Sequence, residues 1–381
     1  MKKPIKITSS LAVGFLLTIF QIGYLTFAED QSDYLTVTGP CNLEFPRDHG
    51  PHPGYRTEWW YYTGNLKSKI GNDYGFQLTI FRSQISPLGS NRDWPNPPSA
   101  WRTQQIYLGH AALSDISAKH HMQAEIVSRE ALGMAGGGQN KGVTSIFIQH
   151  WSIHIESEQH SLKVTADDFA FELTLIPEKS PVLHGDAGYS RKGSTPERAS
   201  CYYSFTRLRT KGTLSKAGET EFVEGFSWMD REFSSAALEP GLIGWDWFSL
   251  QLSDNTEIMI YLLRKKDGEL SPVSSGTFVD AAGQAHPLKR DDFRIEVLQT
   301  WKSPTSRAVY PVKWQMQIFP LSIEMMIIPN FADQEMQTLK STGITYWEGS
   351  ILVNGTKKGL PLAGHGYAEL TGYAKPFDAA M

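Results

Sequence analysis

A stretch near the middle of the chain combines aromatic rings and charged groups in a way that suits acid–base chemistry. It runs from Gly225 to Leu252 and contains six candidate residues: Trp228, Trp245, Trp247, Asp230, Asp246 and Arg231. Aromatic faces lower the local dielectric, so a carboxylate held among them either pairs with a cation or shifts its pKa. The stretch therefore predicts a proton-transfer site. A buried Asp230–Arg231 pair at a domain junction is the structural alternative.

A second segment carries the same combination of residue types. Glu58 stands beside Trp59 and Trp60, which makes it a third candidate carboxylate among aromatic rings. We expect these two tryptophans, together with those of the central stretch, to contact an apolar ligand.

Other catalytic and metal-binding patterns fit the chain less well. Ser227 lies in a Gly-Phe-Ser-Trp-Met sequence that lacks the second glycine of a nucleophile elbow. His49, His52 and Glu58 could form a metal set, but no His-Glu-x-x-His or paired-cysteine spacing occurs. We therefore expect no metal and no cofactor.

The first 28 residues have the composition of a signal peptide. Three lysines precede an apolar run from Leu11 to Ile22, and small residues then stand where a signal peptidase cleaves. Their removal shifts the formal charge from −4 to −7, which argues against a nucleic-acid partner. No later apolar stretch is long enough to span a membrane. The expected location is the periplasm or the cell exterior, where Cys41 and Cys201 could form a disulfide.

The candidate residues are expected to lie on β-strands. Aromatic and β-branched residues alternate with polar ones in runs bounded by Gly, Asn, Asp or Pro. The predicted strands of the first half are Thr57–Asn65, Tyr74–Gln84, Gln105–Asp115, Ser145–Glu156, His160–Thr165 and Phe169–Ile176. Two short helices are expected, within 128–134 and 330–340, and the glycine-rich residues 136–142 are expected to form a flexible connection.

The end of the chain repeats the pattern of its middle. Aligning Tyr203-Ser204-Phe205 with Tyr346-Trp347-Glu348 brings three later pairs together: Gly225 with Gly364, Trp228 with Tyr367, and Asp230 with Glu369. The repeat predicts two related β-domains, and Tyr367 becomes a further candidate ligand contact. The expected divisions are 1–28 for the leader, 29–233 for the first domain and 234–381 for the second. The central stretch then lies where the two domains meet, a favoured place for a ligand pocket.

Several segments resemble the lipocalin-like AttH family of secreted proteins, which is related to the carotenoid 1,2-hydratases (hydroxyneurosporene synthases). They are Asp48–His52, Arg56–Leu66, Ser227–Phe233, Gly244–Phe248 and Gly366–Tyr373, and they span nearly the whole chain after the leader. The resemblance implies two lipocalin-like antiparallel β-barrels side by side. It also implies an association with an ABC transporter of the MacB-like type.

The related hydratases add water to an isolated alkene without a redox cofactor. Such a reaction needs an acid, aromatic faces that stabilise a cation and a positioned water. Asp230 or Asp246 could be the acid, with Arg231 setting its pKa. Near the central tryptophan, where the hydratases carry a histidine, this chain has Phe226 and Ser227. This difference favours a related apolar ligand over a carotenoid.

Two functions, from different classes, follow from these observations. The first is binding of a lipid or isoprenoid by an exported protein, with an ABC transporter as a possible partner. The second is a cofactor-independent hydratase or hydrolase acting on such a molecule. A purely structural role of the aromatic residues, in a transporter accessory subunit, is a third alternative.

Overall fold

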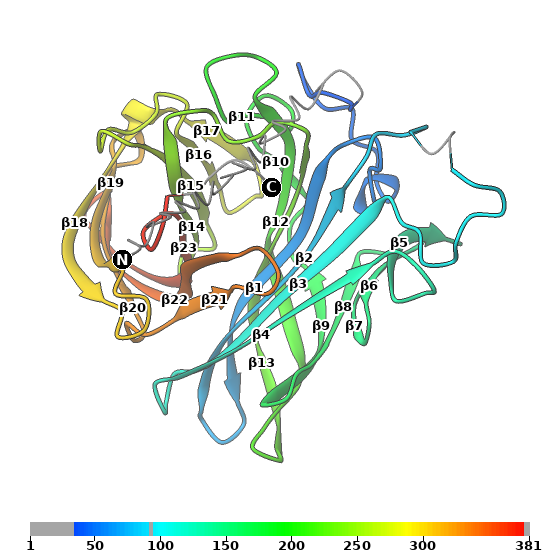
Figure 1. Cartoon of the computed structure of the whole chain (residues 1–381). Coiled ribbons are helices and arrows are strands. Elements are labelled where there is room, and N and C mark those ends of the chain that lie inside the picture. The colour runs from blue at the N-terminus through cyan, green and yellow to red at the C-terminus, as the bar shows by residue number, and fades with distance from the viewer. Residues whose placement is uncertain (1–33, 91–93, 377–381) are drawn as a thin grey trace, which may run out of the picture. The chain divides into compact units, whose positions relative to one another are not determined.

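The chain folds almost entirely into β-strands. The computed structural model describes residues 34–90 and 94–376, and these contain three short 3-10 helices and no α-helix (Figure 1). The strands form two antiparallel sheets, one of 13 strands and one of 10. The all-β prediction is confirmed. The predicted leader, residues 1–28, lies outside the described residues.

The first sheet has the strand order β4-β3-β2-β1-β13-β12-β9-β8-β7-β6-β5, with β10 and β11 paired to β12. Because β6 also packs against β2, β3 and β4, this sheet curls into a nearly closed, lipocalin-like barrel. Its strands are β1 (Thr57–Ser68), β2 (Asp73–Gln84), β3 (Gln105–Asp115), β4 (His120–Arg129), β5 (Ala135–Asn140), β6 (Val143–Ile148), β7 (Trp151–Glu156), β8 (Gln159–Thr165), β9 (Phe169–Pro177), β10 (Val182–Leu183), β11 (Tyr189–Arg191), β12 (Ala199–Lys216) and β13 (Glu219–Ser234).

The second sheet has the order β17-β16-β15-β14-β23-β22-β20-β19-β18, with β21 paired to β22. Its strands are β14 (Leu242–Leu252), β15 (Glu257–Lys265), β16 (Ser275–Val279), β17 (Ala285–Leu288), β18 (Phe293–Lys302), β19 (Val309–Ile318), β20 (Ile323–Pro329), β21 (Glu335–Thr338), β22 (Ile344–Lys357) and β23 (Leu360–Leu370). The 3-10 helices are η2 (Arg47–His49), η3 (Arg290–Asp292) and η4 (Phe319–Leu321). Both sheets belong to one compact unit of the chain.

Three local predictions were wrong in detail. The expected strand over residues 145–156 is the hairpin β6–β7, which turns at Gln149 with a φ of 53°. The glycine-rich connection contains strand β5, because its backbone pairs with β6. Neither expected helix forms: residues 335–338 are strand β21, and residues 128–134 end β4 and continue into a turn. In each case pairing with a neighbouring strand outweighs local preference.

The internal repeat corresponds to equivalent places in the two sheets. Strands β2-β1-β13-β12-β9 follow one another in the first sheet as β15-β14-β23-β22-β20 do in the second. In this correspondence Asp230 of β13 matches Glu369 of β23. Their neighbours on the adjoining strands are Ser204 and Glu348, so Tyr202, and not Tyr203, matches Tyr346. The sequence alignment was therefore shifted by one residue at the first tyrosine.

Each sheet encloses its own apolar core, and a third cluster lies between the sheets. The first core contains Trp60 and Tyr62 of β1 and Met229 of β13. The second contains Phe248 and Leu250 of β14. Because side chains alternate along a strand, the residues next to these point out of each core toward the other sheet. The strands β1, β13, β14 and β23 thus each present one face to a core and one to the junction.

Two further features concern the ends and the surface of the fold. Cys41 and Cys201 form a disulfide that joins the segment before β1 to β12. Among residues 34–90 and 94–376, no helix has the length and apolar character needed to cross a membrane.

Candidate functional site

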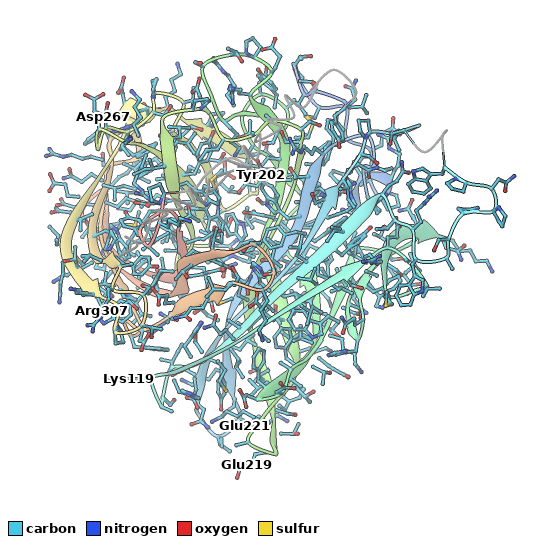
Figure 2. The ribbon with its side chains drawn as sticks, viewed as in Figure 1. Lys119, Tyr202, Glu219, Glu221, Asp267 and Arg307 are labelled. Atoms are coloured by element: carbon cyan, nitrogen blue, oxygen red, sulfur yellow. A yellow bond between two sulfur atoms is a disulfide. The ribbon has the colours of Figure 1, made fainter. Side chains whose placement is uncertain are left out.

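An aromatic cluster occupies the junction of the two sheets. We call it the inter-sheet cluster; its buried rings come from both sheets and are Tyr61, Tyr202, Trp228, Trp247, Tyr261 and Tyr367. Leu242, Met259 and Leu263 also belong to it, and Trp59 and Trp245 are partly buried at its margin. Tyr202 projects from β12 at this junction in Figure 2. The rings of Tyr61 and Trp247 meet edge to face, with centroids 5.2 Å apart. Five of the six predicted ligand-contacting aromatic residues lie in this cluster.

Trp60 is the exception among the predicted ligand contacts. Its ring belongs to the first core, and its indole Nε1 donates a hydrogen bond to the His49 carbonyl at 2.8 Å. Trp59 and Trp60 are adjacent on β1, so they project to opposite faces of the strand. Trp60 therefore supports the first barrel and does not reach the inter-sheet cluster.

Asp230 is the acid of this cluster. Its carboxyl is 4% exposed and accepts hydrogen bonds from the Tyr202 hydroxyl at 2.7 Å, from Trp228 Nε1 at 2.6 Å and from the Ser204 hydroxyl. Burial raises the pKa of Asp230 to about 7, although these three donors oppose the rise. A carboxylic acid with a pKa close to neutral can both give and take a proton at physiological pH.

Two chains of hydrogen bonds lead away from Asp230 toward the second sheet. Trp247 Nε1 donates to the Tyr202 oxygen at 3.1 Å. On the other side, His184 Nε2 lies 2.7 Å from Ser204 Oγ, and His184 Nδ1 lies 2.8 Å from Thr277 Oγ1. Because Ser204 donates to Asp230, Nε2 must carry the ring hydrogen and donate to Ser204. Burial lowers the pKa of His184 to about 3, so this histidine is neutral.

Arg231 does not pair with Asp230, contrary to the sequence-based interpretation. The two residues are adjacent on β13, so their side chains lie on opposite faces. Arg231 instead contacts the Glu58 carboxylate on the barrel side, and its guanidinium lies 3.9 Å from the centroid of the Trp60 ring. It therefore does not set the pKa of the carboxyl in the inter-sheet cluster.

Glu58 is likewise remote from the inter-sheet cluster. It is fully buried at one end of the first barrel, between the Arg82 and Arg231 guanidiniums, with His52 at 3.3 Å. Burial opposes ionisation, but Arg231, His52 and Arg82 together lower the pKa of Glu58 below its usual range. A permanently ionised carboxylate between two arginines is a structural ion pair and a poor proton donor.

Asp246 is also separated from the tryptophans beside it. It lies on the core side of β14, where it accepts hydrogen bonds from Arg264 Nε at 2.9 Å and from the Tyr373 hydroxyl at 3.1 Å. Trp245 and Trp247 project from the opposite face. Of the four predicted catalytic residues, the structure brings only Asp230 to the inter-sheet cluster.

A second group of acids lies at the same junction. Glu348 of β22 and Glu369 of β23 are register partners, and Trp245 Nε1 donates to Glu369 at 3.1 Å. Burial raises the pKa of Glu369 to about 8, with Asp230 and Glu232 adding to the rise. Burial and the Glu369 carboxyl raise the pKa of Glu348 well above its usual range. Both glutamates are therefore candidates for holding protons at neutral pH.

The candidate residues that sequence reasoning missed come from strands distant along the chain. Tyr202 and His184 carry no motif of their own, and Ser204 and Glu348 were noted only as part of the repeat. The alignment of Asp230 with Glu369 was the one signal that pointed to a second acid. Extending it along β12 and β22 would have pointed to Ser204 and Glu348.

A surface cavity lies at the edge of this region, and the described residues form no metal site. Within the described part of the chain, no group of three or more His, Cys, Asp or Glu side chains is placed to hold a metal ion. A surface cavity of about 440 Å³ is lined by residues 239–242, 265–267 and Ser271. Leu242 belongs to both this cavity and the inter-sheet cluster, so the cavity reaches the edge of the cluster.

Comparison with known proteins finds a matching family and a similar crystal structure. A model of the AttH-like family matches residues 36–373. A crystal structure assigned to AttH from Nitrosomonas europaea is 34% identical, with a TM-score of 0.79 over 89% of this chain and 99% of that one. No curated protein gives a significant match.

Two more distant structures share the fold alone. Kievitone hydratase from Nectria haematococca is 16% identical, with a TM-score of 0.67, and the match covers 90% of this chain and 98% of that one. CghA is 13% identical, with a TM-score of 0.54 over 91% of this chain and 98% of that one. The two-sheet architecture is thus common to proteins of widely different sequence.

Proposed function

The chain belongs to the AttH-like family, and on that premise we propose that it is a cofactor-independent, hydratase-like enzyme acting on an apolar unsaturated ligand such as a lipid or isoprenoid. The observation that carries the proposal is Asp230, a buried acid with a pKa raised to about 7 among the aromatic rings at the sheet junction. The hydratase fold of a distant relative supports the same reaction class.

Asp230 is the proposed proton donor. Its carboxyl proton passes to one alkene carbon, the π electrons form the new C–H bond, and a carbocation remains on the other carbon. The faces of Trp228 and Trp247 stabilise this cation. Water then forms the C–O bond and releases a proton, so alkene and water give an alcohol. The same steps in reverse are a dehydration.

The hydrogen-bond chains around Asp230 support its role in proton transfer. When the carboxyl loses its proton, the hydroxyls of Tyr202 and Ser204 and the indole of Trp228 already donate to the resulting carboxylate. No reorientation is needed at the moment of reaction, which is the basis of electrostatic preorganisation. His184 holds the Ser204 hydroxyl in its donating orientation.

Export and a transporter partner are also part of the proposal. The Cys41–Cys201 disulfide is of the kind found in oxidising compartments, which supports a periplasmic or secreted location. The association with a MacB-like ABC transporter rests on the family resemblance, and delivery of the ligand to or from that transporter would suit an apolar molecule.

The experiment that tests the function is hydration in H₂¹⁸O. The folded protein is incubated with lycopene, squalene and oleic acid, and mass spectrometry measures ¹⁸O in the alcohol products. We expect Asp230→Asn to lower the rate about 100-fold or more, the usual contribution of a positioned acid. Asp246→Asn is the matched control, because its carboxyl is buried on the other face of β14.

The alternative of a binding protein predicts a different outcome. A binder yields a stoichiometric lipid or isoprenoid in an organic extract, no ¹⁸O product, and no change with Asp230→Asn. Absence of both a product and an extracted ligand from the folded protein would contradict both functions and favour the transporter-accessory role.

A further inference from the structure

The second acid group, Glu348 and Glu369, faces the same cluster from the second sheet. In both sheets the acid lies at the equivalent place: β13 carries Asp230 where β23 carries Glu369. The cross-sheet contacts are reciprocal. Trp247 of the second sheet reaches Tyr202 beside Asp230, and Tyr61 of the first sheet lies beside Glu348. Each sheet thus completes the acid group of the other.

Two polar atoms in the second group are buried without a hydrogen bond. Within residues 34–90 and 94–376, Tyr61 Oη and Glu348 Oε1 have no partner of acceptable geometry, although the side chains are only 5% and 2% exposed. The hydroxyls of Tyr61 and Tyr346 are nevertheless close enough to Glu348 to favour its ionised form, so Tyr61 Oη and Glu348 Oε1 lie near one another without a well-aligned hydrogen bond. Buried polar groups are almost always paired, so two adjacent unpaired atoms indicate a place for a polar guest such as water.

The second group also has its own supporting histidine. His110 Nδ1 lies 3.1 Å from the Tyr346 hydroxyl, and His110 Nε2 lies 2.8 Å from Ser341 Oγ. His110 is fully buried, and burial lowers its pKa to about 3, as it does for His184. Each acid group therefore has a neutral histidine hydrogen-bonded to a hydroxyl beside it: His184 to Ser204, and His110 to Tyr346.

Tyr61 lies between the two acid groups. On β1 it is the register partner of Asp230, and its ring meets that of Trp247, the register partner of Glu369. Glu348, Glu369 and Asp230 all act on the Tyr61 hydroxyl electrostatically. A ligand among these rings would therefore have Asp230 on one side and the glutamate pair on another.

We propose that Tyr61, Glu348 and Glu369 form a second proton-transfer centre, which positions the attacking water and accepts its proton while Asp230 supplies the proton to the alkene. This inference rests on the proposed hydratase function and assigns its base. The two unpaired atoms, Tyr61 Oη and Glu348 Oε1, are the proposed contacts of the water.

In the proposed reaction, the glutamate pair begins with one proton between its two carboxyls and accepts a second from the water. With one glutamate of the pair protonated and the other ionised, the water oxygen attacks the cation and its proton passes to the ionised glutamate. Asp230 ends as a carboxylate and both glutamates end protonated. One proton must then return from the glutamate pair to Asp230, directly or through solvent, which restores the starting state.

The groups that face the glutamate pair come from several strands. Tyr61 of β1 and Tyr346 of β22 face Glu348, and burial with Glu348 nearby raises the pKa of Tyr367 on β23. Trp245, Asp230 and Glu232 act on Glu369. Among these groups, no cation offsets the two carboxyls, and like charges so placed favour holding one proton between them.

Infrared spectroscopy tests the shared proton without any substrate. The folded protein in D₂O near pH 7 should show the C=O stretch of protonated carboxyl groups, and Glu348→Gln should change that band by removing one of the sharing partners. Glu335→Gln is the control, because Glu335 is buried in the same sheet but accepts a hydrogen bond from Ser303 at 2.8 Å. An identical band in wild type and Glu348→Gln would overturn the shared proton.

Two isotopes separate the roles of the acid groups during turnover. With lycopene in D₂O and H₂¹⁸O, Asp230→Asn should lose both deuterium and ¹⁸O incorporation. Glu348→Gln and Tyr61→Phe should lose ¹⁸O in the alcohol about 100-fold or more but still place deuterium in the recovered alkene, because Asp230 still protonates the alkene and the uncaptured cation returns to an alkene by losing a proton. Circular dichroism checks that each variant is folded.

The outcomes distinguish the two proposals. No label in wild type from lycopene, squalene or oleic acid overturns the hydratase function and with it the base assigned here. Label in wild type with full ¹⁸O incorporation in Glu348→Gln overturns the second centre alone. Loss of deuterium in Glu348→Gln also overturns the division of roles.

Discussion

Two buried carboxyl groups lie on opposite faces of the paired strands β1 and β13, and their pKa values are shifted in opposite directions. On the junction face, Asp230 accepts hydrogen bonds from three neutral donors and forms no ion pair within the described residues, and burial raises its pKa to about 7. On the barrel face, Glu58 contacts the arginine next to Asp230 in the sequence, and its pKa is lowered. Both carboxyls are buried, so the neighbouring cations decide which one can act as an acid.

The face of β13 toward the barrel therefore stabilises the fold, and its face toward the junction carries an acid that can transfer a proton. The ion pairs of the barrel face close one end of the first barrel and keep the Glu58 carboxylate ionised. On the junction face, the cation Lys192 pairs with Glu232 at 3.2 Å, whereas Asp230 and the glutamate pair have no ion-pair partner among the described residues and can titrate near neutral pH. Three variants test this contrast, beginning with the largest expected effect.

Breaking the barrel-face ion pair should cost the most stability. Glu58→Gln leaves Arg82 and Arg231 buried without their carboxylate, and such uncompensated charges cost about 3–5 kcal/mol. The midpoint of urea unfolding at pH 7 measures the loss, with Asp230→Asn as the control. A loss below about 1 kcal/mol would show that the barrel face is not held by this pair.

Asp230→Asn should remove a loss of stability that wild type undergoes as pH rises. The pKa of Asp230 is raised from 3.8 when unfolded to about 7 when folded, so the folded state binds more protons between these values. The stability of wild type therefore falls as pH rises from about 4 to about 7, whereas the side-chain amide of the Asp230→Asn variant cannot ionise.

Between pH 4 and pH 8, the free energy of unfolding of Asp230→Asn should rise relative to that of wild type. The expected rise is a few kcal/mol, on the order of the free energy equivalent to the pKa change. Urea unfolding at pH 4, 6 and 8 measures the difference, in which the titrating groups remote from Asp230 cancel. A constant difference across these pH values would contradict the raised pKa. For Glu58 the sign is reversed, since its stabilisation is present above its unfolded pKa and is lost in acid.

The smallest effect is expected from removing one donor to Asp230. Trp228→Phe deletes the indole hydrogen bond to the carboxylate, which is worth about 1 kcal/mol, so the pKa of Asp230 should rise by about one unit or less. Infrared titration of the carboxyl band measures the shift. Trp60→Phe, whose indole donates to the His49 carbonyl on the other face, should leave it unchanged.

Much of the fold could be predicted from the sequence because its strands carry local signals. The run Thr57–Asn65 lies within β1, and Tyr74–Gln84 lies within β2, since aromatic and β-branched residues favour paired strands. The aromatic part of the site was also predictable, because Trp228, Trp247 and Tyr367 stand in recognisable segments. The family and the all-β class followed from the same segments.

The chemical partners were less predictable, for two different reasons. Pairing Asp230 with Arg231 was an avoidable error, since neighbours on a strand project to opposite faces. The contact of Asp230 with Ser204 depends on pairing between β12 and β13, and the contact of Ser204 with His184 depends on a loop held against the second sheet. Such contacts are set by packing between distant segments, which no local pattern records.

The reciprocal contacts across the junction have the geometry of a two-fold symmetric dimer contained in one chain. In a dimer of identical subunits, any substitution appears twice and changes both halves of an isologous interface. Two copies in one chain can diverge separately. Ser204 and Glu348 occupy equivalent places beside equivalent acids. In a symmetric dimer these two places would carry the same residue. Because one is a serine and the other a glutamate, each half of the junction has its own chemistry.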